Sequence, residues 1–357
     1  MKKATTERVT TAIGTSNIAF IKYWGRRDEK LNLPTNSSIS MTLDETVSTK
    51  TSVIFSKAMD TDRLFINGKE EDLTGELNEK SRFIKSMLDY VRSLSHVEMG
   101  ALIVSRNNFP SSSGLASSAS GGATLAFVLS EALGLGLSRR EMSLIARRIS
   151  GSACRSVYGG IVRWNKGIKE DGSDSVAEQV VNESYWTELM DIIAIVDPSK
   201  KRVSSSAGHA ATIRTSSLYA GRPAFAEKGA EIVASAIVKR DFQQLGEAIM
   251  RDSNNMHATM LDTYPPIIYL TDISKDIMFR IHELNEENGK CVAAYTFDAG
   301  ANAHIITTSA YRSAVMNMLQ ETSGVRSIIE AHAGSGPRSL GETSSLIDAN
   351  TLMPLKE

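Results

Sequence analysis

A serine- and glycine-rich segment, residues 109–121 (FPSSSGLASSASG), constrains the fold more than any other stretch of the chain. It follows an apolar run at residues 101–104 and leads into apolar residues at 125–129, so the pattern predicts a strand, a turn and a tightly packed helix. The N–H groups and positive dipole end of such a helix can bind phosphate. The GK[ST] ending of a Walker A loop is absent. Spacing alone favours a serine-rich surface loop beside an alanine-lined helix at least as strongly.

The rest of the chain alternates strand-like and helical segments without GxGxxG or a regular βαβ repeat, which indicates the α+β class. We expect residues 9–24 to be extended, and Asn67-Gly68 signals the turn of a hairpin that involves residues 51–56 and 63–66. Ser138 and Glu141 have capping-box spacing, and a lobe boundary is expected near residues 185–191. Helices are expected at 77–94, 225–238, 242–250 and 277–284, and strands at 192–196, 292–297 and 304–307.

Length and charge limit the possible classes of protein. The 357 residues suffice for two lobes or one large domain. The formal charge is −1, from 40 basic and 41 acidic residues, which argues against a nucleic-acid or membrane-surface partner. Two cysteines without CxxC spacing are too few for a disulfide framework and indicate no metal site. The sequence has no secretory signal and no 18-residue apolar run, so we expect a protein of the reducing cytoplasm without a membrane span.

Three further segments place charged or hydroxyl side chains beside apolar elements. Residues 150–156 (SGSACRS) put hydroxyls and Arg155 at the predicted end of a helix, where a guanidinium suits a carboxylate or phosphate. Lys22 follows a predicted strand, and Arg26 lies just beyond it. Asp298 follows an apolar strand and precedes a glycine, a typical place for a positioned carboxylate. Taken alone, each has a commoner explanation: a capped helix end, a solvated strand end, or a turn-capping aspartate.

Together the four segments resemble the diphosphomevalonate decarboxylases, within the superfamily named after galactokinase, homoserine kinase, mevalonate kinase and phosphomevalonate kinase. Further matches to the family's pattern extend over most of the chain, and chance does not explain so many separated agreements. They are NIA at 17–19, YWG at 23–25, LNLPTNSS at 31–38, DGSDS at 171–175, VSS at 203–205, DSN at 252–254, HAT at 257–259 and YPP at 264–266.

The resemblance implies a two-lobed α/β sandwich with the active site in the cleft between the lobes. Residues 1–188 would form a ribosomal-protein-S5-like lobe with the phosphate-binding loop, and residues 189–357 a ferredoxin-like lobe with the catalytic aspartate. Asp298 and Lys22 would be the catalytic pair. The substrate would be bound by Tyr23, Arg26, Ser150, Ser152, Arg155 and Ser206, with Arg155 on its carboxylate. Nucleotide phosphates would be bound by Ser112, Gly114, Ser117 and Ser118.

The implied reaction is the ATP-dependent decarboxylation of mevalonate 5-diphosphate to isopentenyl diphosphate, phosphate and CO2. ATP would act with Mg2+ as co-substrate, without a dedicated metal site on the protein. Asp298 could accept the proton of the substrate hydroxyl while Lys22 stabilises the phosphoryl group. The resemblance also implies a homodimer.

Several positions depart from the family's pattern. Arg26 stands where lysine is usual, Ser206 where arginine or threonine is usual, His209 where methionine is usual, and Ala301 where proline is usual. These departures leave two other decarboxylase substrates open: mevalonate 3,5-bisphosphate, without ATP, and mevalonate 5-phosphate, which would give isopentenyl phosphate. A mevalonate kinase that stops after phosphorylation is disfavoured because both members of the lysine–aspartate pair are present. A phosphate-binding module without catalysis is disfavoured because all four segments are retained.

Overall fold

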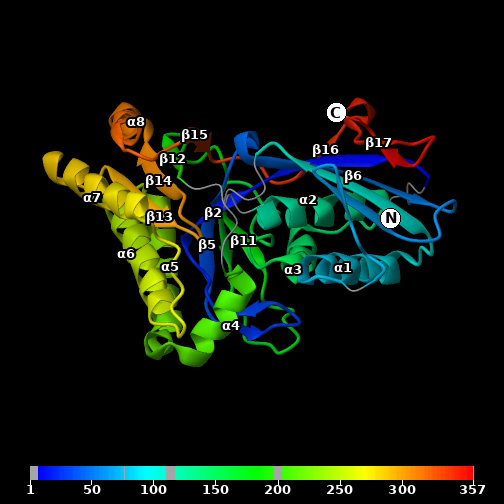
Figure 1. The fold of residues 1–357 in the computed structure, drawn as a ribbon, viewed down its shortest axis with the longest axis horizontal. Helices are drawn as coiled ribbons and strands as arrows, with labels where there is room; N and C mark the ends of the chain where they lie inside the picture. The colour runs from blue at the N-terminus through cyan, green and yellow to red at the C-terminus, as the bar shows by residue number, and fades with distance from the viewer. Residues whose placement is uncertain (1–6, 76, 110–116, 197–202, 357) are drawn as a thin grey trace.

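The computed structural model describes residues 7–75, 77–109, 117–196 and 203–356 and shows an elongated molecule with two lobes (Figure 1). The N-terminal lobe contains a six-stranded sheet and the C-terminal lobe a four-stranded sheet. A second four-stranded sheet lies between these two, in the middle of the molecule. The site described below lies where the lobes meet, so the arrangement of the sheets determines which segments can reach it.

The six-stranded sheet has the order β16-β1-β6-β9-β7-β8 and is antiparallel except for the pair β7 and β9. Helix α2 packs against β1 and β6, and its small residues, including Ala119 and Ala123, permit close approach to the sheet. The strands are β1 (Thr10–Thr15), β6 (Ser48–Ser56), β7 (Arg63–Ile66), β8 (Lys69–Glu71), β9 (Gly100–Asn107) and β16 (Arg338–Leu340), and the helices are α1 (Glu79–Ser95), α2 (Ser117–Ala132) and α3 (Arg139–Ile149).

The middle sheet has the order β11-β10-β5-β2, with antiparallel neighbours. Every residue of β2 and β5 is buried, as expected for strands covered on both faces. Its strands are β2 (Asn17–Ile21), β5 (Ser38–Thr42), β10 (Ile161–Trp164) and β11 (Ala177–Val181). Two short pairs lie outside the main sheets: β3 (Arg26–Asp28) with β4 (Leu33–Pro34), and β17 (Ile347–Asp348) with β18 (Met353–Pro354).

The C-terminal sheet has the antiparallel order β13-β14-β12-β15. Helix α6 packs against β13 of this sheet and also against β2 of the middle sheet, so it connects the two lobes. The strands are β12 (Leu189–Ile195), β13 (Ala293–Phe297), β14 (Ala303–Thr308) and β15 (Ser327–His332), and the helices are α4 (Ser205–Thr215), α5 (Arg222–Lys239), α6 (Phe242–Leu261), α7 (Asp272–Glu287) and α8 (Arg312–Glu321). Short 3-10 helices are η1 (Glu45–Val47), η2 (Ser217–Gly221), η3 (Ser309–Tyr311) and η4 (Glu342–Ser344).

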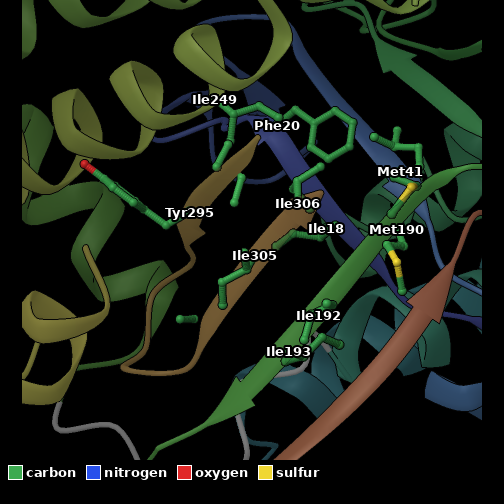
Figure 2. Packing of buried hydrophobic residues seen from close by; sticks show 14 of the residues in the cluster. Ile18, Phe20, Met41, Met190, Ile192, Ile193, Ile249, Tyr295, Ile305 and Ile306 are labelled. Atoms are coloured by element: carbon green, nitrogen blue, oxygen red, sulfur yellow. The ribbon is translucent and has the colours of Figure 1, made fainter. Parts of the chain in front are cut away.

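The largest apolar cluster draws on both lobes (Figure 2). Ile18 and Phe20 of the middle sheet, Ile249 of α6, and Ile192 and Ile305 of the C-terminal sheet are all fully buried within it. Full burial of such a side chain contributes roughly 1.5–3 kcal/mol to stability. The middle sheet and the C-terminal lobe therefore share one core, whereas the six-stranded sheet packs with α1, α2 and α3 around a separate apolar cluster.

The expected mixed α/β fold with two lobes is confirmed, as is the capping box of Ser138 and Glu141. The predicted hairpin is partly wrong. Asn67 and Gly68, with φ of 48° and 77°, form the turn between β7 and β8, whereas β6 and β7 do not pair because β9 lies between them. The strand β16 returns to pair with β1 of the N-terminal lobe. The predicted boundary between residues 188 and 189 stays a prediction. Within the described residues, no helix is both long and apolar enough to cross a membrane.

Candidate active site between the lobes

A cavity of about 690 Å³ receives side chains from both lobes. The end of β2 contributes Lys22 and the residues after it, the start of α2 contributes Ser117 and Ser118, and the C-terminal lobe contributes Asp298. These segments lie far apart in the chain, and all belong to the segments singled out in the sequence. The structure thus gathers the described candidate residues into one site.

Lys22 and Asp298 are in direct contact at the centre of this cavity. Lys22 Nζ donates to Asp298 Oδ1 at 2.5 Å and to the carbonyl of Ala19 at 2.9 Å. The lysine side chain is 3% exposed, whereas the aspartate side chain is 30% exposed. Both side chains line the cavity, and the carboxylate is the more exposed member of the pair.

Arg155 is a buried cation that donates hydrogen bonds to three neutral side chains. Its guanidinium donates to Ser40 Oγ at 2.9 Å, Ser38 Oγ at 2.8 Å and Asn17 Oδ1 at 3.0 Å. Burial lowers the pKa of Arg155, because the charged form is desolvated, and the charge of Asp298 partly opposes this effect. A buried guanidinium held by neutral oxygens attracts an anion into the cavity, such as a carboxylate.

A chain of serine hydroxyls connects α2 with the end of α3. Ser118 Oγ lies 3.3 Å from Ser150 Oγ, which lies 3.0 Å from Ser152 Oγ. Ser117 and Ser118 are the first two residues of α2, so they lie at the positive end of the helix dipole. Two other predicted nucleotide-binding residues, Ser112 and Gly114, lie outside the described residues.

Three of the predicted substrate-binding residues, Tyr23, Arg26 and Ser206, line the cavity together with His209. An Arg26 guanidinium nitrogen donates to Ser206 Oγ at 3.0 Å. The His209 ring lies between Tyr23 and Trp24, with centroid distances of 4.8 Å and 4.3 Å. Burial, and secondarily the charge of Arg26, lowers the pKa of His209 well below its ordinary value, so this ring is neutral at pH 7. The only formal positive charge among these four side chains is that of Arg26.

The part of the cavity beside β7, β8, β9 and α1 has a mixed lining. Its apolar residues include Leu64, Ile66, Phe83, Ile84 and Ile103, and its polar or charged residues include Asn67, Lys69, Glu71, Ser105 and Asn107. Apolar walls that also carry polar groups are typical of sites for small molecules. No motif in the sequence identified this part of the site.

Sequence reasoning also missed the partners of Arg155. Asn17 and Ser38 lie inside the matched segments 17–19 and 31–38, so the pattern drew attention to them but assigned them no role. They are 138 and 117 positions from Arg155, and local spacing carries no information about a contact at that separation.

Comparisons with known proteins agree with this geometry. Residues 14–177 match the family model of the diphosphomevalonate decarboxylase-like N-terminal domain, and residues 191–351 match that of the mevalonate 5-diphosphate decarboxylase C-terminal domain. A diphosphomevalonate decarboxylase of Bos taurus is 43% identical over 314 residues, which cover 84% of this chain and 76% of the relative.

Solved structures are similar over nearly the whole chain. The mevalonate diphosphate decarboxylase of Trypanosoma brucei has a TM-score of 0.88 at 33% identity, covering 96% of this chain and 100% of that one. A structure described as "MDDEF in complex with MVAPP, AMPPCP and Magnesium" has a TM-score of 0.83 at 35% identity, covering 93% and 98%.

The fold and the site define a two-lobed enzyme whose cavity holds a buried lysine against an accessible aspartate. The two family models together span both lobes, and the identity to the bovine relative extends over most of the chain. The chain belongs to the diphosphomevalonate decarboxylase family.

Proposed function

We propose that the chain catalyses the ATP-dependent decarboxylation of mevalonate 5-diphosphate to isopentenyl diphosphate, phosphate and CO2. The observation that carries the proposal is the contact between Lys22 Nζ and Asp298 Oδ1 in the same cavity as the buried cation Arg155. The similar structure described with MVAPP, AMPPCP and magnesium supports the choice of substrate and co-substrate.

The proposed reaction begins at the tertiary hydroxyl of the substrate, which is a poor leaving group. Asp298 accepts the hydroxyl proton while the oxygen forms a bond to the γ-phosphorus of ATP, and ADP leaves. Lys22 stabilises the negative charge on the transferred group. The C3–O bond then breaks and phosphate departs with the electron pair. The C1–C2 bond breaks, CO2 is released, and its electrons form the C2=C3 double bond.

The remaining cavity residues would bind the two reactants. Arg155, with Ser150 and Ser152, would bind the substrate carboxylate, because the guanidinium is the buried cation on that side of the cavity. Tyr23, Arg26 and Ser206 would bind the 5-diphosphate. Together with the rest of the predicted loop, Ser117 and Ser118 would bind the ATP phosphates at the start of α2.

The remaining parts of ATP also have fitting surroundings. The part of the cavity beside β7, β9 and α1 would hold the adenine ring between apolar side chains such as Ile66 and Ile103, with polar side chains such as Asn67 and Ser105 nearby. Among the described residues, no group of three or more His, Cys, Asp or Glu side chains could hold a metal ion. Mg2+ would therefore arrive on the ATP phosphates, whose oxygens are the ligands it prefers.

A turnover assay tests the proposal and separates it from the alternatives. Purified protein is offered mevalonate 5-diphosphate, mevalonate 5-phosphate or mevalonate 3,5-bisphosphate, each with and without MgATP, while CO2 and ADP are measured. We expect CO2 from the 5-diphosphate with MgATP only. CO2 from the 3,5-bisphosphate without ATP, or ADP without CO2, would instead identify one of the other activities.

The variant Asp298→Asn tests the role of the carboxylate. It preserves the size of the side chain but removes the group that accepts the hydroxyl proton, so we expect CO2 release to be lost while the melting temperature changes little. Turnover close to that of the unmodified protein would remove Asp298 from the mechanism.

We also propose that the protein acts in the cytoplasm as a homodimer. The family resemblance supports both statements. Sedimentation velocity of the purified full chain measures the oligomeric state directly.

A further inference from the structure

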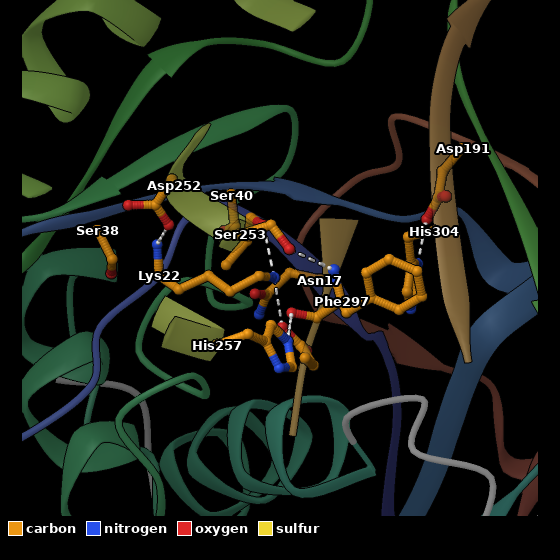
Figure 3. A network of polar contacts seen from close by, with 12 residues as sticks. Asn17, Lys22, Ser38, Ser40, Asp191, Asp252, Ser253, His257, Phe297 and His304 are labelled. Carbon is orange, nitrogen blue, oxygen red and sulfur yellow. Dashed lines mark hydrogen bonds and ion pairs between the residues drawn. The ribbon is translucent and has the colours of Figure 1, made fainter. Parts of the chain in front are cut away.

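The backbone of Lys22 is held on both sides by a buried ion pair from the C-terminal lobe. The Lys22 N–H donates to Asp252 Oδ2 at 2.8 Å, and the Lys22 carbonyl accepts a hydrogen bond from an Arg222 guanidinium nitrogen at 2.7 Å. Figure 3 shows Asp252 directly beside Lys22. The backbone of Lys22, directly after β2, is therefore fixed by two residues of the C-terminal lobe.

The ion pair is itself completely enclosed. Arg222 contacts both carboxylate oxygens of Asp252, at 2.7 Å and 3.1 Å, and neither side chain has exposed surface. A buried pair of this kind contributes little net stability, because desolvation offsets the attraction, yet removal of one partner is costly. Its bidentate geometry gives the carboxylate a defined orientation toward the Lys22 N–H.

Asp252 lies on α6, and this helix also contacts β13, the strand that directly precedes Asp298. The Phe297 N–H donates to Ser253 Oγ at 3.1 Å, and the Phe297 carbonyl lies 3.3 Å from His257 Nε2 (Figure 3). Burial lowers the pKa of His257 to about 4, so the ring is neutral at pH 7. Because a carbonyl only accepts, Nε2 must carry the ring proton and donate it.

One helix thus contacts both catalytic segments through adjacent side chains. Ser253 and His257 are four residues apart, so they project from the same face of α6, and Asp252 is next to them. Helix α6 also packs against both β2 and β13. A rigid element of this length sets the separation of two strands more precisely than a loop could.

We propose that Asp252, Ser253 and His257 of α6, together with Arg222, are positioning residues that hold Lys22 and Asp298 at reacting distance. The proposal rests on the catalytic role proposed above for that pair. It assigns a function to the sequence segments 252–254 and 257–259, which matched the family's pattern without an assigned role. A misplacement of about 1 Å can lower a rate about 100-fold, so loss of either hydrogen bond to Phe297 should reduce turnover.

The experiment replaces the two neutral members, because their removal leaves no buried charge without a partner. Ser253→Ala and His257→Phe are compared with Thr307→Val. This control loses the buried hydrogen bond from Thr307 Oγ1 of β14 to the carbonyl of Val292, which directly precedes β13. Phe297 lies at the opposite end of β13. For each full-length variant, kcat, KM and the melting temperature are measured with mevalonate 5-diphosphate and MgATP.

We expect kcat to fall about 10- to 100-fold in Ser253→Ala and His257→Phe with little change in KM, since the substrate contacts remain. Thr307→Val should show a similar loss of melting temperature with kcat unchanged. Unchanged kcat in the two test variants, or an equal loss of kcat in Thr307→Val, would overturn the positioning role. Asp298→Asn separates this outcome from failure of the proposed function: if that variant retains turnover, the catalytic pair itself is wrong.

Discussion

Arg155 is a buried cation in the candidate site. Its guanidinium donates hydrogen bonds to the neutral side chains of Asn17, Ser38 and Ser40. In the proposed complex, the substrate carboxylate supplies the negative charge that these partners lack. We expect Arg155→Gln to raise KM for mevalonate 5-diphosphate about 10- to 100-fold, because a hydrogen bond to a charged group contributes about 1.5–3 kcal/mol.

Steady-state kinetics and calorimetric binding of mevalonate 5-diphosphate check this expectation. Arg163→Gln is the matched control, because Arg163 contacts Glu231 at 2.6 Å instead of a group in the cavity. Its KM should not change. Equal affinity in Arg155→Gln and the unmodified protein would contradict the assignment of Arg155 to the carboxylate.

At the residue scale, the sequence indicated the residues that line the site better than it indicated the residues that hold them in place. Lys22, Asp298 and Arg155 each stand beside an apolar element or within a matched segment, so the sequence alone indicates them as site residues. Asp252 and Arg222 lie 230 and 200 positions from Lys22. Arg222 lies on α5 and Asp252 on α6, and their contact with the Lys22 backbone follows from the way both helices pack against β2. No local periodicity in the sequence predicts that packing.

At the scale of elements, helix α3 begins at a side-chain cap and ends at a residue that lines the candidate site. The Ser138 hydroxyl and the Glu141 carboxylate form the capping box at its N-terminus, and Ser150 caps its C-terminus inside the site. We expect Ser138→Ala to lower the free energy of unfolding by about 1 kcal/mol, because one N–H group of the first turn loses its acceptor.

Urea unfolding measures the effect of Ser138→Ala, with Ser93→Ala as its control. The exposed Ser93 hydroxyl donates a hydrogen bond to the Tyr90 carbonyl of its own helix, so its loss should change the free energy of unfolding by less than about 0.5 kcal/mol. The value of kcat should be unaffected in both variants. Equal stability of the two variants would show that the capping box does not anchor α3.

Elements were predicted more successfully than the pairing between them. The turn at Asn67-Gly68 was identified correctly because a two-residue turn is a local feature. The partner of β7 on its other side is β9, which runs parallel to it and begins 34 positions after β7 ends, so sequence proximity suggested β6 instead. Parallel pairing requires a long connection, here through α1, and its partner cannot be deduced from spacing alone.

At the scale of the whole molecule, buried histidines make stability depend on pH. His257 and His209 are enclosed in the folded protein, and burial lowers the pKa of each, to about 4 for His257 and well below 6.5 for His209. In the unfolded chain both rings titrate near their ordinary value, about 6.5. Below that pH the unfolded state binds protons that the folded state does not, so the free energy of unfolding falls as the pH decreases from about 6.5 toward about 4.

His257 alone should account for about 3 kcal/mol of this decrease, since each pKa unit corresponds to about 1.4 kcal/mol. Urea unfolding at pH 7.5, 6 and 5 measures the part that is lost above pH 5, about 2 kcal/mol. Carboxylates also titrate toward the acidic end of this range, so the informative quantity is the difference between the unmodified protein and a variant without the histidine. His257→Phe should be less stable at pH 7.5, because it loses a hydrogen bond, but should lose less stability on acidification. Thr307→Val should be destabilised equally at all three pH values, and the same pH dependence in His257→Phe as in the unmodified protein would contradict a neutral, buried His257.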